Sequence, residues 1–158
     1  MAQQPQRPWT PAEERLGTVA VRIMSALNTW IFQWSGGRLG NRFMRGAPVL
    51  LLTTTGAKSG AQRTTPLIYL ADGPRVVLVA SKGGMSHSPG WYHNLVAHPE
   101  CTVQIGGAKR AMHARRASRE EKAALWPRLV AIYRDYDDYQ ARTRRDIPVV
   151  ILSPREPV

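Results

Sequence analysis

The chain has 158 residues, 43% of them hydrophobic, and a formal net charge of +11. This length suits one domain with a single substantial core. The charge predicts attraction to anions, whether nucleic acid, lipid head groups or an acidic small molecule. With only one cysteine, Cys101, one chain cannot form a disulfide framework or a cysteine-based metal site, which favours a reducing compartment.

The sequence predicts neither a membrane-spanning helix nor an export signal. A spanning helix needs roughly 18 to 20 apolar residues, and here Arg22 and Asn28 interrupt the apolar stretches. The start is polar, contains prolines, and leads into Glu13 and Glu14 without a cleavage-like site. We therefore expect a cytoplasmic protein.

Residues 1–11 are rich in glutamine and proline, which predicts a disordered arm. Residues 12–34 are predicted to form an amphipathic N-terminal helix, because apolar residues recur at helical spacing. These residues are Leu16, Val19, Ala20, Ile23, Met24, Leu27, Trp30 and Ile31. The helix can pack on the protein's own core, or lie at a membrane interface, which a basic helix with a terminal tryptophan also suits. Residues 35–158 then form the main domain.

Short β-like segments separated by turn residues follow, a pattern typical of an antiparallel sandwich or barrel. Strands are predicted at 49–54, 65–71, 75–81, 101–105, 110–117 and 147–152. The apolar run 76–79 predicts a strand that is buried on both faces. Pro66 indicates a strand start or a sheet edge. Turns are predicted at Asp72-Gly73-Pro74 and at Gly106-Gly107.

Two helices are predicted within this domain. Residues 91–97 form a short helix that stops before His98-Pro99, because a residue that precedes proline resists the α conformation. Ser118 followed by Glu121 is a capping box that opens a longer helix. Pro127 is predicted to kink or restart that helix before 129–139.

Two loops combine hydroxyls, glycines and cations. The first, residues 53–63, carries Lys58 and Arg63, and its glycines would let backbone N–H groups approach an anion. It lacks the glycine spacing of a Walker loop. The second, Ala80-Ser81-Lys82-Gly83-Gly84, follows the buried strand. Both loops are candidate sites for a phosphate or carboxylate, and a solvated hairpin is the alternative for the first.

Three tyrosines, Tyr133, Tyr136 and Tyr139, lie three residues apart and would fan across a helix face by about 60° per step. They can pack on the barrel, or line a pocket where a phenol stacks on a flat ligand and donates a proton. The four histidines lack a metal-ligand spacing, and no G-x-S-x-G elbow is present. We therefore predict no metal site and no serine hydrolase.

In order along the chain, these motifs resemble the F420-dependent nitroreductase family of actinobacteria. The resemblance extends from about residue 27 to residue 150 and is densest at 51–60, 80–84, 91–95 and 133–140. It implies a mainly β fold with flanking helices, a split β-barrel related to flavin-reductase and pyridoxamine-phosphate-oxidase proteins. It also implies the reduced deazaflavin cofactor F420H2, whose phosphodiester and glutamate tail would explain the basic charge.

The resemblance assigns residues to the cofactor and to the acceptor. Lys58, Ser59, Gly60 and Arg63 would hold the phosphate and tail, and the loop Ala80, Ser81, Lys82, Gly83 and Gly84 would reach the same group. Pro66, Trp91, Tyr92 and Asn94 would border the ring. Ser81, Tyr133, Tyr136 and Tyr139 would line the acceptor pocket, with Tyr136 as the main contact to the acceptor and Ser81 as a hydrogen-bond partner of the acceptor.

The implied reaction passes a hydride from F420H2 to a quinone or nitroaromatic. Gly90 and the charged pair Arg134-Asp135 depart from the best-known member and predict a wider, more charged pocket. Relatives are linked to membrane quinone reduction, so the N-terminal helix would contact an anionic membrane at the inner face of the cell membrane. Two alternatives remain open. One is an FMN-dependent oxidoreductase on the same barrel, and the other is a basic nucleic-acid-binding domain without the usual aromatic platforms.

Overall fold

The computed structural model describes the backbone of residues 7–34 and 46–155, and the side chains of these residues except 24–34. Within these ranges the chain forms four α-helices and seven strands. The helices are α1 Pro11–Trp34, α2 Gly90–Ala97, α3 Arg119–Ile132 and α4 Asp135–Arg142. The strands are β1 Val49–Thr55, β2 Gln62–Ile68, β3 Leu70–Asp72, β4 Arg75–Val79, β5 Glu100–Ile105, β6 Ala108–Arg116 and β7 Val149–Pro154.

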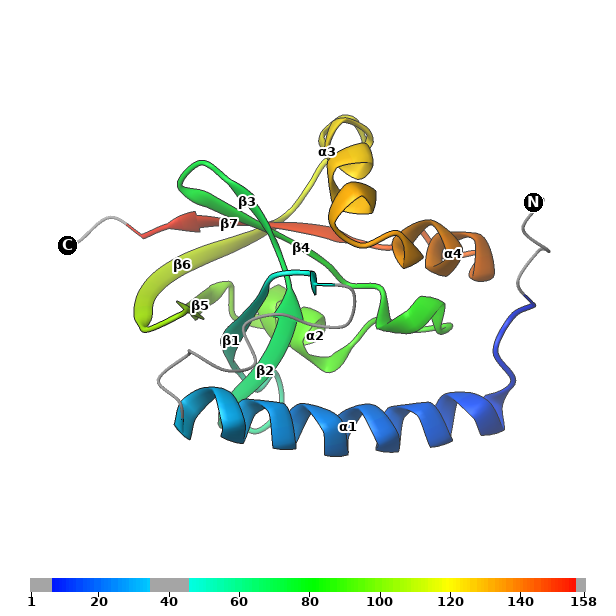
Figure 1. Cartoon of the computed structure of the whole chain (residues 1–158), viewed down its shortest axis with the longest axis horizontal. Helices are drawn as coiled ribbons and strands as arrows, with labels where there is room; N and C mark the ends of the chain where they lie inside the picture. Colours follow the sequence, from blue (N-terminus) through cyan, green and yellow to red (C-terminus); the bar gives the residue numbers. More distant parts are fainter. Residues whose placement is uncertain (1–6, 35–45, 156–158) are drawn as a thin grey trace.

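The strands form one curled antiparallel sheet in the order β2-β1-β5-β6-β7-β4-β3. One face packs on α2 through Trp91 and Leu95, and the opposite face packs on α3 and α4 through Leu129 and Tyr136. Figure 1 shows α2 beside the strands, α3 and α4 away from it, and α1 along one side. The predicted split β-barrel with flanking helices is therefore confirmed.

Strand β4 lies between two hydrophobic clusters, as its unbroken apolar run predicted. Val76 and Leu78 belong to the cluster around α2, whereas Val77 and Val79 belong to the cluster under α3 and α4. All four side chains are buried. Successive strand residues point to opposite faces, so a strand covered on both sides has no solvent-facing position for a polar residue.

The predicted turns are present, and one predicted strand is divided. Gly73 (φ 59°) and Gly106 (φ 58°) occupy two-residue turns, where glycine accepts a positive φ at little cost. The predicted strand 65–71 is divided at Tyr69 into β2 and β3, although the Tyr69 N–H still donates to the Pro48 carbonyl. Pro66 lies on β2, an edge of the sheet.

Helix α3 opens with the predicted capping box. The Ser118 hydroxyl accepts from the Glu121 N–H at 3.1 Å, and the Glu121 carboxylate accepts from the Ser118 N–H at 3.0 Å. Pro127 does not restart the helix, because α3 continues through it to Ile132. Leu125 and Leu129, on either side of the proline, are both buried in the cluster that covers the sheet. This packing offsets the hydrogen bond that proline cannot donate.

Helix α1 covers the range predicted for the amphipathic helix, with one more residue at its start. Its described part has an exposed apolar stripe of Leu16, Val19 and Ile23, which are 78%, 55% and 65% exposed. None of the helices in the described ranges combines the length and apolar character of a bilayer-spanning segment.

Candidate cofactor and acceptor site

The β1–β2 loop (residues 56–61) is a tight turn closed mainly by its own backbone. The Gly56 N–H donates to the Ala61 carbonyl at 2.8 Å, and the Gly60 N–H donates to the Gly56 carbonyl at 2.9 Å. The Ser59 hydroxyl accepts from the Ala61 N–H at 3.1 Å. Gly60 has a φ of +69°, which a side-chain-bearing residue rarely adopts. The loop therefore keeps its shape without a ligand.

Two cations of this region are exposed and available to a ligand. Lys58 lies on the loop and Arg63 lies at the start of β2. Within the described part of the chain, neither side chain has a carboxylate partner. Cations without a paired carboxylate keep their charge for an incoming anion, and the guanidinium can bind phosphate through two parallel bonds.

Asn94 connects α2 to this loop. Its Oδ1 accepts from the Ala57 N–H at 3.0 Å, and its Nδ2 donates to the Thr54 hydroxyl at 3.1 Å. The sequence analysis assigned Asn94 to the border of the cofactor ring, and the structure gives its amide a further task of orienting the β1–β2 loop. The predicted ring-bordering residues Trp91 and Tyr92 precede Asn94 on the same helix.

The β4–α2 loop (residues 80–89) contains an unusual run of left-handed residues. Lys82, Gly83 and Gly84 have φ values of 44°, 63° and 76°. Lys82 is not a glycine, so this conformation stores strain that the surrounding contacts must offset. Its Nζ lies 2.7 Å from the His87 Nε2, and burial lowers the pKa of the ammonium.

Gly84 places this loop directly against α4. A Cβ built at Gly84 would lie 2.5 Å from the Tyr139 carbonyl oxygen, a distance that atoms do not tolerate. Only glycine allows the two backbones to approach so closely. By contrast, a Cβ at Gly83 would meet nothing within 4 Å. The close approach holds Ser81 and Lys82 next to the helix that carries Tyr136 and Tyr139.

The N-terminal region also binds the β4–α2 loop. The Glu14 carboxylate accepts from the Ser86 N–H at 2.8 Å and from its hydroxyl at 2.9 Å. The Trp9 indole N–H donates to the Gly83 carbonyl at 2.8 Å, and the Arg142 guanidinium lies 4.6 Å from the Trp9 ring centre. Trp9 falls in the range predicted as a disordered arm, where the structure shows specific contacts.

The three tyrosines form one aromatic cluster, although they come from two elements. Tyr133 directly follows α3, whereas Tyr136 and Tyr139 lie on α4. The ring centres are 5.1 to 6.4 Å apart, and the Tyr133 and Tyr139 hydroxyls are 3.2 Å apart. Tyr136 is 4% exposed, and burial raises the pKa of its phenol and that of Tyr133. These phenols therefore stay protonated at neutral pH.

The predicted site residues thus fall into two groups, one in each of the two loops that adjoin α2. The first turn of α2 adjoins the β4–α2 loop. Asn94 lies four residues after Gly90, about 6 Å further along the helix, and bonds to the β1–β2 loop. The first group, with Lys58 and Arg63, is suited to an anion, and the second joins Ser81 to the tyrosines. Sequence reasoning missed Trp9, Glu14 and Arg145, which contact the β4–α2 loop without any local motif that marks them.

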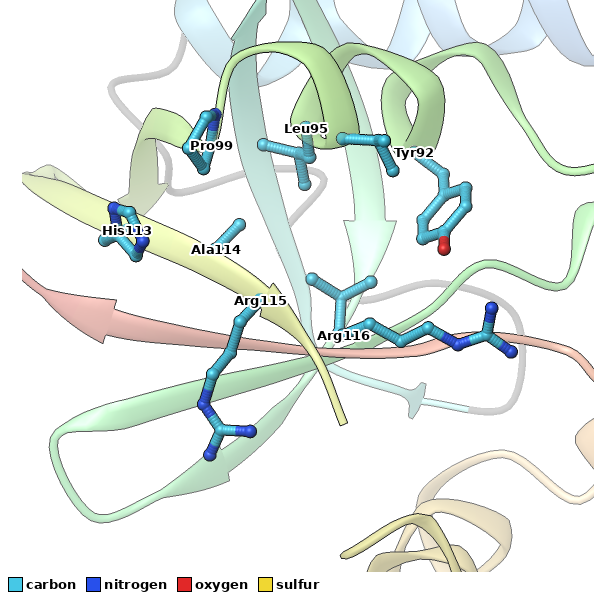
Figure 2. Close-up of a pocket in the computed structure, with 9 residues that line it drawn as sticks. Tyr92, Leu95, Pro99, His113, Ala114, Arg115 and Arg116 are labelled. Carbon is cyan, nitrogen blue, oxygen red and sulfur yellow. The ribbon is translucent and has the colours of Figure 1, made fainter. Parts of the chain in front are cut away.

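A cleft of about 290 Å³ lies between α2 and strands β6 and β7 (Figure 2). Of the predicted cofactor residues, Tyr92 lines it, and Figure 2 shows its phenol pointing toward the Arg116 side. Arg115 and Arg116 already pair with carboxylates, Glu121 at 2.7 Å and Asp146 at 3.2 Å. The cleft consequently offers less unpaired charge to an anion than the β1–β2 loop.

Comparison with known proteins places this split β-barrel among F420H(2)-dependent reductases. A family model for F420H(2)-dependent quinone reductases matches residues 24–154. The F420H(2)-dependent quinone reductase Rv1261c of Mycobacterium tuberculosis is 40% identical over 146 residues, which are 90% of this chain and 95% of that protein. Rv3178 of the same organism is 45% identical over 118 residues, 75% of this chain and 99% of that protein.

A solved structure agrees with these sequence relatives. The F420-H2 dependent reductase FDR-A matches with a TM-score of 0.63 and 41% identity, over 67% of this chain and 94% of that one. The chain belongs to the F420H(2)-dependent quinone reductase family. It is accordingly an oxidoreductase that uses reduced F420, as the resemblance implied.

Proposed function

We propose that this protein transfers a hydride from F420H2 to a quinone, and that the two loops flanking α2 divide the task. One observation carries the proposal. The β1–β2 loop region has two exposed cations that can bind an anion, and a second loop packs against the helix of the tyrosine cluster. Reduced F420 supplies the hydride when bound. The residues of the chain hold the cofactor, align the acceptor and provide hydrogen bonds.

On the cofactor side, Lys58 and Arg63 bind the phosphodiester and the start of the glutamate tail. The donor set fits such a group, because both cations are exposed and lack a carboxylate partner among the described residues. The open space around a Cβ at Gly60 leaves room for a ligand to approach the backbone. Tyr92 borders the ring from α2, whereas the Trp91 side chain is buried against the sheet and supports this helix.

On the acceptor side, Ser81 and the tyrosine cluster orient the quinone. Tyr136 is a protonated phenol at neutral pH, as any tyrosine is, and its hydroxyl donates a hydrogen bond to an acceptor oxygen as that oxygen becomes more basic. The aromatic rings of Tyr133 and Tyr139 supply flat surfaces beside it.

The test follows oxidation of F420H2 by absorbance with three additions: a menaquinone analogue, a nitroaromatic, and no acceptor. We expect quinone-dependent oxidation well above the rate without acceptor. Tighter binding of FMN than of F420 would instead favour a flavin enzyme on the same barrel. Absence of oxidation with every acceptor would overturn the proposal.

The protein works at the inner face of the cell membrane, where its quinone acceptor is dissolved. Support comes from the exposed stripe of Leu16, Val19 and Ile23 on α1, which Arg15 and Arg22 flank on one side. Such a helix buries its apolar face in the head-group region while its cations meet anionic lipids. Residues seven apart lie on one face, since a helix turns about 100° per residue.

The matched variants are Leu16→Ser with Ile23→Ser, and Val21→Ser as control. Val21 is 57% exposed but lies about 140° around the helix from Leu16, outside the stripe. We expect the double variant to lose binding to vesicles that contain anionic lipid, and the control to bind as the parent does. Equal binding by all three proteins would show that α1 does not contact the membrane. Point variants test this contact better than a deletion of residues 1–34 would. The deletion would also remove Trp9 and Glu14, whose side chains bond to the β4–α2 loop.

A further inference from the structure

Arg145, between α4 and β7, directs its whole guanidinium at the β4–α2 loop. Its Nε donates to the Met85 carbonyl and one Nη donates to the Ser81 carbonyl, both at 2.8 Å. Longer bonds of 3.3 Å reach the Ala80 carbonyl and the Ser88 hydroxyl. One side chain thus holds four residues that lie about 60 positions earlier in the sequence.

The backbone of Arg145 is itself fixed to the helix of the tyrosines. Gln140, next to Tyr139 on α4, donates through Nε2 to the Arg145 carbonyl at 2.8 Å. The Gln140 Oε1 accepts from the Ile147 N–H at 3.0 Å. Arg145 therefore connects α4 to the β4–α2 loop through bonds at both ends.

The contacts of Arg145 differ from those of the surface arginines. Arg115 and Arg116 pair with carboxylates, whereas the Arg145 guanidinium donates to carbonyls and a hydroxyl of the loop. Arg145 is half-buried, and burial lowers the pKa of its guanidinium. A planar fork with five donors can satisfy several carbonyls at once, which a lysine ammonium cannot do in the same geometry.

The loop segment held in this way is the strained one. Ser81 and Lys82 lie at its start, and Lys82 has a left-handed backbone without being a glycine. Strain of that kind persists only where neighbouring contacts fix the chain. The guanidinium bonds to the Ala80 and Ser81 carbonyls, immediately before Lys82, provide such contacts.

We propose that Arg145 is a positioning residue for hydride transfer, because it fixes Ser81 and Lys82 relative to Tyr136 and Tyr139. The inference rests on the proposed function in placing Ser81 and the tyrosines at the acceptor. Without the guanidinium bonds the loop can relax. Misplacement of a reacting or positioning group by about 1 Å can lower the rate about 10²-fold. None of the bonds of the Arg145 guanidinium involves Lys58 or Arg63, so the contacts of these two cations with the F420 phosphate should persist without it.

The experiment compares Arg145→Gln and Arg145→Lys with Arg144→Gln, which removes the same charge from the exposed neighbouring arginine. We expect both Arg145 variants to lower kcat with the quinone by about 10²-fold, with F420 affinity within about threefold of the parent. Arg144→Gln keeps the parent values. Amide hydrogen exchange of residues 80–88 should accelerate in the Arg145 variants and not in Arg144→Gln.

A double-mutant cycle with Ser81→Ala then separates positioning from general stability. If Arg145 acts through Ser81, the two substitutions together cost clearly less than the product of their separate effects. Multiplicative effects, or exchange of residues 80–88 that matches the parent, would overturn the inference. The exchange measurement needs no turnover, so it still decides the role of Arg145 if the parent reduces no quinone and the proposed function fails.

Discussion

The β1–β2 loop and the β4–α2 loop resemble each other in sequence but are held differently. Each places a lysine among glycines and hydroxyls after a buried strand. The β1–β2 loop is closed by its own backbone and one amide, that of Asn94, and Lys58 remains exposed. The β4–α2 loop is bound by Arg145, Glu14 and Trp9, and is packed on α4.

This difference suggests that one loop contributes mainly charge for binding and the other mainly fixed side-chain positions for catalysis. A loop that shapes itself and leaves its cations exposed can contribute electrostatic affinity without being displaced by ligand binding. A loop fixed by contacts from several elements holds its side chains within the narrow tolerance that catalysis requires. We therefore expect changes in the β1–β2 loop to alter F420 affinity and changes around the β4–α2 loop to alter turnover.

The largest effect is expected for Tyr136→Phe, in the cluster beside the β4–α2 loop. Phenylalanine keeps the buried ring and removes only the hydroxyl, so stability should change little. If the hydroxyl donates to the acceptor during hydride transfer, its loss should lower kcat by roughly 10²- to 10⁴-fold. Steady-state kinetics with a menaquinone analogue, beside F420 titration, measures both quantities.

Tyr133→Phe is the control for packing within the same cluster, because its hydroxyl contacts that of Tyr139. It should lower kcat less than Tyr136→Phe does. Parent-like turnover of Tyr136→Phe would leave that residue a purely structural role, and Ser81→Ala would become the test of the acceptor contact.

The next effect concerns two adjacent glycines of the β4–α2 loop. Both Gly83 and Gly84 have positive φ, so alanine at either position costs about 1–2 kcal/mol in backbone strain. Alanine at Gly84 also collides with the Tyr139 carbonyl. This steric clash should lower the free energy of unfolding by about a further 1–3 kcal/mol. Denaturant unfolding should therefore show Gly84→Ala as clearly less stable than Gly83→Ala. Equal stabilities would mean that the loop does not approach α4 so closely.

Lys58→Ala tests the other loop. Loss of one charge-assisted contact should weaken F420 binding by about 1.5–3 kcal/mol, while kcat at saturating F420 and the melting temperature stay close to the parent values. Lys109→Ala is the control, since it removes an equal charge from an exposed position at the β5–β6 turn. A variant that binds F420 as tightly as the parent would exclude this loop as the phosphate site.

The parts of the fold that sequence predicted well depend on local chemistry. Gly73 and Gly106 mark two-residue turns, Ser118 and Glu121 form a capping box, and the run 76–79 is buried on both faces. Each of these features depends on residues within a few positions of one another. The strand order, with β7 between β6 and β4, depends on pairings distant in sequence and could not be derived from local patterns.

For the candidate site, too, sequence predicted the local motifs but not the contacts between distant segments. The resemblance pointed to both loops and to the tyrosines, yet a regular helix over 129–139 would have spread the three phenols around its surface. The chain instead ends α3 at Ile132 and starts α4 at Asp135, which gathers the rings. Arg145 escaped prediction because its partners are main-chain carbonyls, which every residue carries and no sequence pattern marks.

The smallest expected effect is the pH dependence of the contact between α1 and the β4–α2 loop. The Ser86 N–H, and to a lesser degree the Ser86 hydroxyl, His87 and Lys82, lower the pKa of Glu14 below its usual value. The folded protein thus prefers the carboxylate, and this stabilisation is complete above the ordinary glutamate pKa of about 4.3. It is lost as the pH falls from there through the lower pKa of the folded state.

Glu14→Gln removes the titrating group and keeps an acceptor oxygen for one of the two Ser86 bonds. The parent should melt at a higher temperature than this variant at pH 7, and the difference should shrink below about pH 4 as the parent carboxylate becomes protonated. F420 affinity at pH 7 should be the same in both proteins, because the β1–β2 loop has no contact with Glu14. A melting difference that stays constant down to acid pH would show that the hydrogen bonds of the Glu14 side chain to Ser86, and not its charge, stabilise the β4–α2 loop.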